Sequence, residues 1–122
     1  MSTLRVAVYG SLKREQYNHV LLKDAKFLCQ EEFKFEGLRM VPYTEVFPAC
    51  VLSGDNKAYP FLGEVYEIDE SILRNLDMLE GYPNFYDRVI VPTVFGEAWL
   101  YYLKKESNKE TIYSWDGPRV LE

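Results

Sequence analysis

The sequence has little cysteine, histidine and basic charge, and these shortages exclude several classes of protein. Of its 122 residues, two are cysteine and one is histidine, so the usual four-ligand or CxxC zinc site is not available. Lys and Arg number 14 against 19 Asp and Glu, which gives a net charge of −5. Nonspecific nucleic-acid binding depends on neutralising phosphates, so the absence of a basic cluster argues against DNA or RNA as a partner.

Long apolar runs are also missing. The longest one without proline, residues 98–103, has about six residues, whereas a membrane-spanning helix needs about 20. The N-terminal segment has neither the apolar length nor the cleavage site of a secretory signal. We therefore expect no membrane association and predict a cytoplasmic location, with Cys29 and Cys50 as buried free thiols.

Apolar residues, by contrast, are plentiful. They make up 48% of the chain, aromatic residues alone 16% and charged residues only 27%, which is enough to bury a core and argues against a disordered chain. No repeat, linker or low-complexity tract interrupts the pattern. The sequence therefore predicts a single domain over residues 1–122.

Periodicity predicts mostly strands, with two helices between them. A short buried strand over residues 5–9 stops at Gly10 and Ser11, and helix-forming residues at 14–22, with Tyr17, Val20 and Leu21 on one face, predict a first helix. Further strands are predicted at 26–35, 61–68, 86–94 and 97–104, the last two joined in a hairpin, and an edge strand or irregular segment at 46–52. Within these, Gly63 marks a bulge or a close backbone approach.

The clearest helix covers residues 70–80, from an N-cap at Asp69 to Gly81. Its apolar stripe consists of Ile72, Leu73, Leu76 and Leu79. Hairpins curled over such a helix indicate an α+β fold built on a small, mostly antiparallel β-barrel with flanking helices.

Glu80 breaks a local rule, because a helix C-terminus disfavours negative charge. Asp77 lies one turn earlier, so like charge and the helix dipole both favour protonation and a raised pKa. A carboxyl group of raised pKa near an apolar face suits a general acid or base. The alternatives are an exposed acid in a frayed turn, or an acid paired with Arg88, which lies with Tyr86 on one side of the next strand.

The turn at Gly10 and Ser11 offers backbone N–H groups that can hold an anion, although a plain tight turn explains the glycine equally well. A nucleophilic Ser11 would need a base, and His19 is the only histidine. That pair has no support beyond coexistence, and a surface or packing role is the simpler interpretation of His19.

Four motifs, in this order along the chain, resemble the γ-glutamylcyclotransferase-like family, most closely its small γ-glutamylaminecyclotransferase and AIG2-like branch. They are Tyr9-Gly-Ser-Leu12, Gly63-Glu-Val-Tyr-Glu-Ile68, Leu76-Asp-Met-Leu-Glu-Gly81 and Tyr86-Asp-Arg88. The resemblance runs from Val6 to about Tyr102. Ser11 stands where many relatives in this branch have threonine, which leaves a backbone role unaffected.

The resemblance implies a small β-barrel and an enzyme that cyclises a γ-glutamyl group to 5-oxoproline, releasing the attached amine, with no metal or cofactor. It carries the catalytic glutamate onto Glu80. It carries the loop that cradles the substrate onto Tyr9, Gly10, Ser11 and Leu12, and it places Tyr86 and Arg88 near the site without a defined role.

This chemistry needs one base and no protein nucleophile, because the α-amine of the substrate itself attacks the γ-carbonyl. A binding domain without turnover, or an assembly module with exposed aromatic residues, are the competing hypotheses. The sequence leaves the departing amine and the oligomeric state open. We expect the residues that recognise this amine within 38–59.

Overall fold

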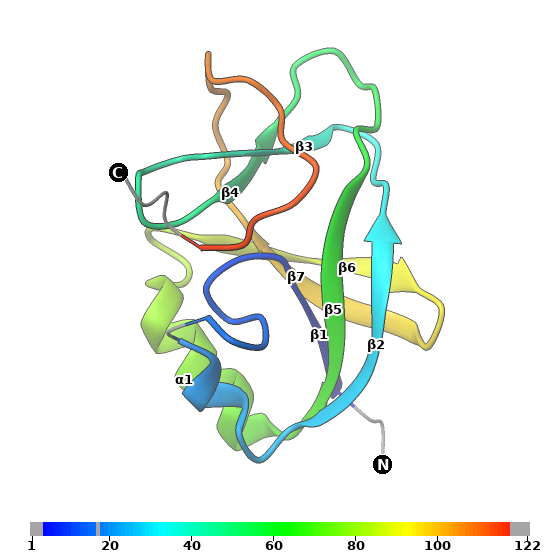
Figure 1. Cartoon of the computed structure of the whole chain (residues 1–122), viewed down its shortest axis with the longest axis vertical. Coiled ribbons are helices and arrows are strands. Elements are labelled where there is room, and N and C mark those ends of the chain that lie inside the picture. The colour runs from blue at the N-terminus through cyan, green and yellow to red at the C-terminus, as the bar shows by residue number, and fades with distance from the viewer. Residues whose placement is uncertain (1–3, 17, 118–122) are drawn as a thin grey trace.

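The computed structural model describes residues 4–16 and 18–117, which form a five-stranded sheet, a two-stranded sheet and an α-helix (Figure 1). The helix α1 is Glu70–Glu80, and a single 3-10 turn, η1, is His19–Leu22. The strands are β1 (Leu4–Val8), β2 (Lys26–Phe33), β3 (Leu38–Val41), β4 (Ala49–Leu52), β5 (Phe61–Ile68), β6 (Asp87–Thr93) and β7 (Gly96–Tyr102). No helix in these ranges is long and apolar enough to cross a membrane.

The large sheet has the strand order β2-β5-β1-β7-β6. β1 pairs with β5 antiparallel and with β7 parallel, and the two outer pairs are antiparallel. In Figure 1, β2 and β5 stand upright while β6 and β7 cross the view, so the sheet is strongly coiled. The mixed α+β class is thereby confirmed.

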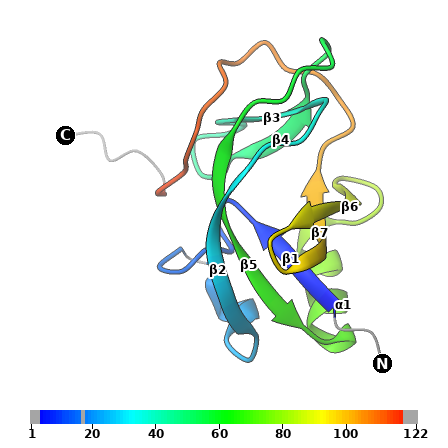
Figure 2. The same cartoon turned by 90° about the vertical axis from the view of Figure 1, so that its right-hand side faces the viewer.

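The predicted β-barrel is not confirmed, because the five-stranded sheet is open. Closure would require the edge strands β2 and β6 to find partners, and β3 and β4 pair with each other instead. An isolated bridge between Val51 in β4 and Leu103, which directly follows β7, connects this small sheet to the large one. Figure 2 shows β3 and β4 together above the upper end of the large sheet.

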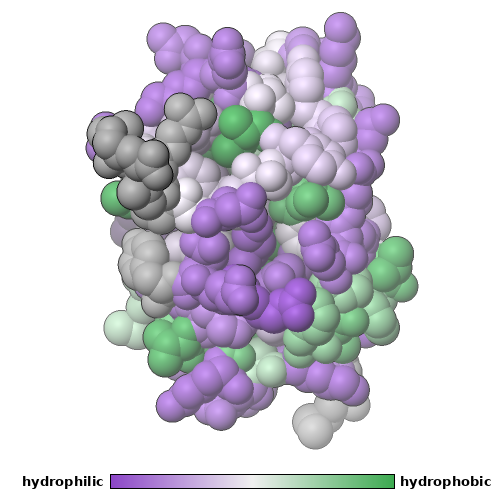
Figure 3. All heavy atoms as spheres, viewed as in Figure 1, coloured by the Kyte–Doolittle hydropathy of each residue, from purple (hydrophilic) through white to green (hydrophobic). Residues whose placement is uncertain are grey.

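The predicted helix at 14–22 is also wrong, since only η1 forms there. Glu15 has a φ of 71°, a left-handed conformation that an α-helix cannot include. Arg14 is held outside a helix by Glu64, which accepts hydrogen bonds from its backbone N (2.9 Å) and its Nε (3.1 Å). Tyr17 lies outside the described residues. The loop between β1 and η1 lies at the hydrophilic centre of the face that Figure 3 shows.

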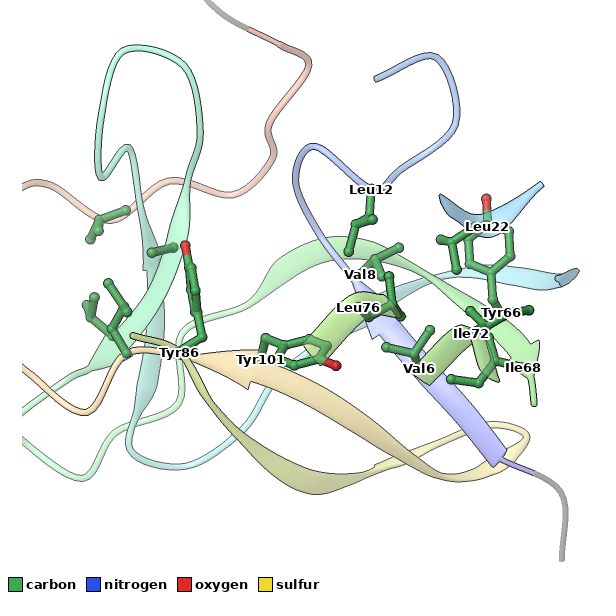
Figure 4. Packing of buried hydrophobic residues seen from close by; sticks show 14 residues of the cluster. Val6, Val8, Leu12, Leu22, Tyr66, Ile68, Ile72, Leu76, Tyr86 and Tyr101 are labelled. Carbon is green, nitrogen blue, oxygen red and sulfur yellow. The ribbon is translucent and has the colours of Figure 1, made fainter. Parts of the chain in front are cut away.

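Side chains of the central strand alternate between two apolar layers, as a strand requires. Val6 and Val8 face α1, where they pack in one cluster with Ile72 and Leu76 (Figure 4). Ala7 points to the other side of the sheet, where it belongs to a second apolar cluster with residues of β2, β3, β6 and β7. Together these layers hold the end of β1 between the helix and the small sheet.

The predictions for β5 and α1 are confirmed, bounds included. The carboxylate of Asp69 accepts a hydrogen bond from the N–H of Ile72 (2.8 Å), and Gly81 ends α1 in a left-handed conformation with a φ of 63°. Gly63 marks a close approach, because a Cβ there would lie 2.6 Å from the carbonyl oxygen of Val8.

Other boundaries differ slightly from those predicted. β2 ends at Phe33, β4 begins only after Pro48, and β3 is a strand that the periodicity does not predict. The β6–β7 hairpin is confirmed, with Gly96 as the first residue of β7. Both cysteines are free thiols; Cys50 is buried as predicted, but Cys29 is only half-buried.

Candidate active site

A cavity of about 160 Å³ opens beside the C-terminal end of α1. Its wall is built by the end of β1 with the following loop, the last turn of α1, the loop before β6 and the segment before β4. Pockets for drug-sized ligands start at roughly 300 Å³. The cavity therefore suits one compact polar group rather than a whole larger molecule.

Glu80 lines this cavity from the last position of α1. The chain reverses immediately after it, because Gly81 adopts the left-handed conformation and its N–H donates to the carbonyls of Asp77 and Met78. The N–H of Tyr86 then donates to the Glu80 carbonyl oxygen (3.1 Å). The reversal brings Tyr86, which also lines the cavity, next to Glu80.

The Glu80 side chain is partly buried and makes no hydrogen bond or ion pair with any described residue. Burial raises the pKa of its carboxyl group from the ordinary value of 4.5 to about 7. The predicted direction is confirmed, but its cause is desolvation rather than repulsion from Asp77. A carboxyl group that titrates near neutral pH can both accept and return a proton.

Asp77 is occupied elsewhere. The hydroxyl of Tyr101 donates to its Oδ1 (2.7 Å), and Nε of Arg88 lies 3.3 Å from the same oxygen. The guanidinium of Arg88 stacks on the rings of Tyr82 (4.5 Å to the centroid) and Trp99 (4.2 Å). Arg88 thus pairs with Asp77 instead of Glu80, and it does not line the cavity.

The loop Gly10, Ser11 and Leu12 forms the side of the cavity at the end of β1. Within residues 4–16 and 18–117, the backbone N–H groups of these three residues donate to no protein acceptor. A Cβ at Gly10 would lie 2.8 Å from Cγ of Pro48, so glycine is needed here for close packing. These three N–H groups therefore lie beside the cavity without an acceptor among the described residues.

Ser11 and His19 do not form a nucleophile–base pair. Oγ of Ser11 accepts a hydrogen bond from Nδ2 of Asn18 (2.9 Å), whereas Nδ1 of His19 donates to the carbonyl oxygen of Leu12 (2.9 Å). The His19 ring packs beside Tyr66 at a centroid distance of 5.7 Å. Both side chains therefore stabilise the loop.

Tyr9 lines the cavity while its hydroxyl binds protein groups. The hydroxyl donates to the Tyr101 carbonyl (2.8 Å) and accepts from the Cys50 N–H (2.9 Å), and burial raises its pKa. The hydroxyl thus joins β1, β4 and β7. Tyr86 is buried, its hydroxyl 3.5 Å from the Pro48 carbonyl oxygen.

The structure thus brings six of the seven predicted site residues to one cavity and leaves Arg88 behind it. The periodicity did not single out four other side chains of the lining: Asn18, Phe47, Phe85 and Tyr101. They come from four separate segments, so no local pattern marks them. Phe47 does lie in the segment 38–59 expected to recognise the departing amine.

The chain is similar in sequence to proteins of one known family. The sequence model described as "Gamma-glutamyl cyclotransferase, AIG2-like" matches residues 6–117. A Methanocaldococcus jannaschii protein, provisionally named a gamma-glutamylcyclotransferase, is 39% identical over 103 residues, which cover 80% of this chain and 82% of that protein. The rat gamma-glutamylaminecyclotransferase is 35% identical over 92 residues, covering 68% of this chain and 58% of the rat protein.

The fold of the chain is also similar to that of a solved structure. The crystal structure of a mouse AIG2-like protein is similar with a TM-score of 0.74 and 26% sequence identity, covering 95% of this chain and 90% of the mouse chain. The overall fold is thus similar to that of an AIG2-like protein.

Proposed function

The chain belongs to the gamma-glutamyl cyclotransferase, AIG2-like family, and from this premise we propose that it cyclises the γ-glutamyl group of a small substrate to 5-oxoproline and releases the attached amine. The observation that carries the proposal is the Glu80 carboxyl group, which is partly buried in the cavity wall, has no hydrogen-bond or ion-pair partner among the described residues, and has a pKa of about 7. A partnerless buried acid costs stability, and a catalytic proton transfer gives a reason for it.

In the proposed reaction, the neutral α-amino nitrogen of the substrate attacks its own γ-carbonyl carbon. A new C–N bond closes the five-membered ring, and ionised Glu80 takes the proton that this nitrogen loses. Glu80 returns the proton to the nitrogen of the departing amine as the γ-amide C–N bond breaks. The protein ends the cycle unchanged, so neither a covalent intermediate nor a cofactor is required.

The cavity supports this reaction by its size and its donors. Space of about 160 Å³ favours a curled γ-glutamyl chain, in which amine and carbonyl are already close. We propose that the free N–H groups of Gly10, Ser11 and Leu12 bind the oxygens of this chain. Tyr9 and Tyr86 shape the wall, and Arg88 acts indirectly by holding Asp77 and thereby the last turn of α1.

The test is mass-spectrometric detection of 5-oxoproline from a panel of γ-glutamyl compounds, with wild type and Glu80→Gln in parallel. We expect product from the wild type and nearly none from the variant, with both proteins equally folded by circular dichroism. Equal product from both would remove Glu80 from the mechanism. Binding without any product would favour the alternative of a non-catalytic γ-glutamyl or amino-acid binding domain.

A further inference from the structure

The mouth of the cavity differs in character from its interior. Its apolar lining includes the half-buried Phe47 and the exposed Leu79 and Phe85. Leu79 is 42% exposed and Phe85 is 50% exposed, although both are large apolar side chains. Exposed apolar groups gathered around an opening indicate that a ligand covers them.

Tyr43 extends this apolar surface. Its ring centroid lies 5.9 Å from that of Phe47 and 6.5 Å from that of Phe85, so it connects two sides of the mouth. These distances suit edge or tilted contacts between aromatic rings. A further ring placed at the mouth would find aromatic partners from two separate segments of the chain.

Two lysines adjoin the same tyrosine. Nζ of Lys105 donates to the Tyr43 hydroxyl and lies 4.6 Å from its ring centroid, and Nζ of Lys109 donates to the Tyr43 carbonyl oxygen (2.6 Å). Neither ammonium group forms an ion pair with a carboxylate of the described residues. The edge of the apolar mouth therefore carries positive charge that is available to an anion.

The proposed function places the departing amine at this mouth, because the interior accommodates the γ-glutamyl part alone. We propose that the departing group is an aromatic or large apolar amino acid, its side chain on Phe47 and Phe85 and its carboxylate facing Lys105 and Lys109. The substrate class is then a γ-glutamyl dipeptide. In γ-glutamyl-ε-lysine the free α-ammonium group of the lysine adds a cation next to two others, which disfavours this substrate. This inference rests on the proposed function and adds the substrate class to it.

The experiment compares kcat/KM for γ-glutamyl-phenylalanine, γ-glutamyl-glycine, γ-glutamyl-ε-lysine and γ-glutamyl-phenethylamine. For the wild type we expect the phenylalanine dipeptide to exceed the glycine dipeptide by about tenfold or more, because its ring is buried at the mouth. Phe85→Ser should lower that ratio by about three- to tenfold. Phe95→Ser is the matched control, because Phe95 is 45% exposed but lies in the β6–β7 turn, away from the cavity.

The role of the two lysines is tested by removing the carboxylate of the departing amino acid. Phenethylamine has the same ring as phenylalanine without the carboxylate, so the ratio between these two substrates reports on the charge. Lys105→Gln should lower this ratio by about two- to fivefold at low salt, and added salt should reduce the difference. Lys34→Gln removes another exposed lysine, one with no hydrogen bond or cation–π contact to Tyr43, and should leave the ratio unchanged.

The outcomes separate this inference from the proposed function. If the wild type forms 5-oxoproline from every substrate at similar rates, or if Phe95→Ser acts like Phe85→Ser, the inference is wrong and the proposed function stands. If no substrate reacts, titration calorimetry of the same compounds decides. Tighter binding of the phenylalanine dipeptide, weakened by Phe85→Ser in a folded variant, upholds the binding site without cyclisation, and equal or absent binding refutes it.

Discussion

Two glutamates that burial removes from water have opposite surroundings. Glu64 in β5 is only 7% exposed, and its Oε1 accepts hydrogen bonds from the Arg14 N–H (2.9 Å) and the Tyr66 hydroxyl (3.0 Å). Its Oε2 accepts from Nε of Arg14 (3.1 Å). Glu80 in the cavity wall has no such partner within the part of the chain that the structure describes.

We propose that this difference in partners distinguishes a structural carboxylate, Glu64, from a catalytic one, Glu80. Three donors stabilise the charge of Glu64, so this residue fixes the loop after β1 in place. Glu80 lacks donors, so its charge is disfavoured and its pKa rises to about 7. Burial alone therefore does not identify a catalytic carboxyl group. A better criterion is a buried carboxyl group that lines a cavity and has no hydrogen-bond donors.

The largest expected effect is on activity. Glu80→Gln keeps the shape of the side chain but removes the base, so kcat/KM should fall by about 10²- to 10⁴-fold. Glu64→Gln, matched in chemistry, should lower it by less than about tenfold, because Glu64 does not line the cavity. Initial rates of 5-oxoproline formation measure both. Similar losses in the two variants would end the distinction between these residues.

The stability of Glu80→Gln should rise, whereas its activity falls. Folded Glu80 keeps its proton up to a pH of about 7, whereas the unfolded chain loses it near 4.5. The stabilisation by protonated Glu80 is complete below pH 4.5 and is lost as the pH rises to 7. Glu80→Gln should therefore be more stable than wild type by about 1 to 3 kcal/mol at pH 8 and equal to it at pH 4.

Glu64→Gln provides the counterpart in the same denaturant titrations. It loses charge-assisted hydrogen bonds and should be less stable than wild type by about 1 to 3 kcal/mol at pH 8. A Glu80→Gln protein that is destabilised at pH 8 would show that ionised Glu80 has stabilising partners after all.

The pH dependence of the rate sharpens the comparison next. Glu80 must be ionised to act as a base, so protonation of Glu80 should lower kcat/KM about tenfold for each pH unit below its pKa of about 7, in addition to the fall that protonation of the substrate α-amine causes. Rates between pH 5 and 8 at constant ionic strength give the profile, and Glu64→Gln should keep the same inflection. A profile without an inflection near 7 would contradict the assignment of Glu80.

The smallest effect concerns a single donor to Glu64. Tyr66→Phe removes the hydroxyl that donates to Oε1, and should lower the free energy of unfolding by about 0.5 to 1.5 kcal/mol without lowering activity by more than about twofold. Tyr113→Phe is the control, because its hydroxyl donates to Glu32 at an exposed site (2.6 Å) and should matter less. Equal losses in both would show that burial adds nothing to the bond.

Sequence patterns predicted elements whose causes are local. The strand 61–68 and the helix 70–80 follow from alternation, an N-cap at Asp69 and a C-terminal glycine at 81, all within reach of one another along the chain. The helix predicted at 14–22 failed because Glu64, 50 residues away, holds Arg14 outside it. The open sheet was missed for a related reason: whether edges pair is decided by distant strands.

The sequence by itself determined that an acid stands at the end of a capped amphipathic helix, one residue before the glycine that reverses the chain, and the motifs around it determined the family. Only the tertiary structure decided which acid is left without partners. Asp77 received Tyr101 and Arg88 from later strands, whereas Glu80 was enclosed by β1, its loop and the segment around Pro48. Desolvation and hydrogen bonding depend on atoms close in space, and those atoms come from segments far apart in the sequence.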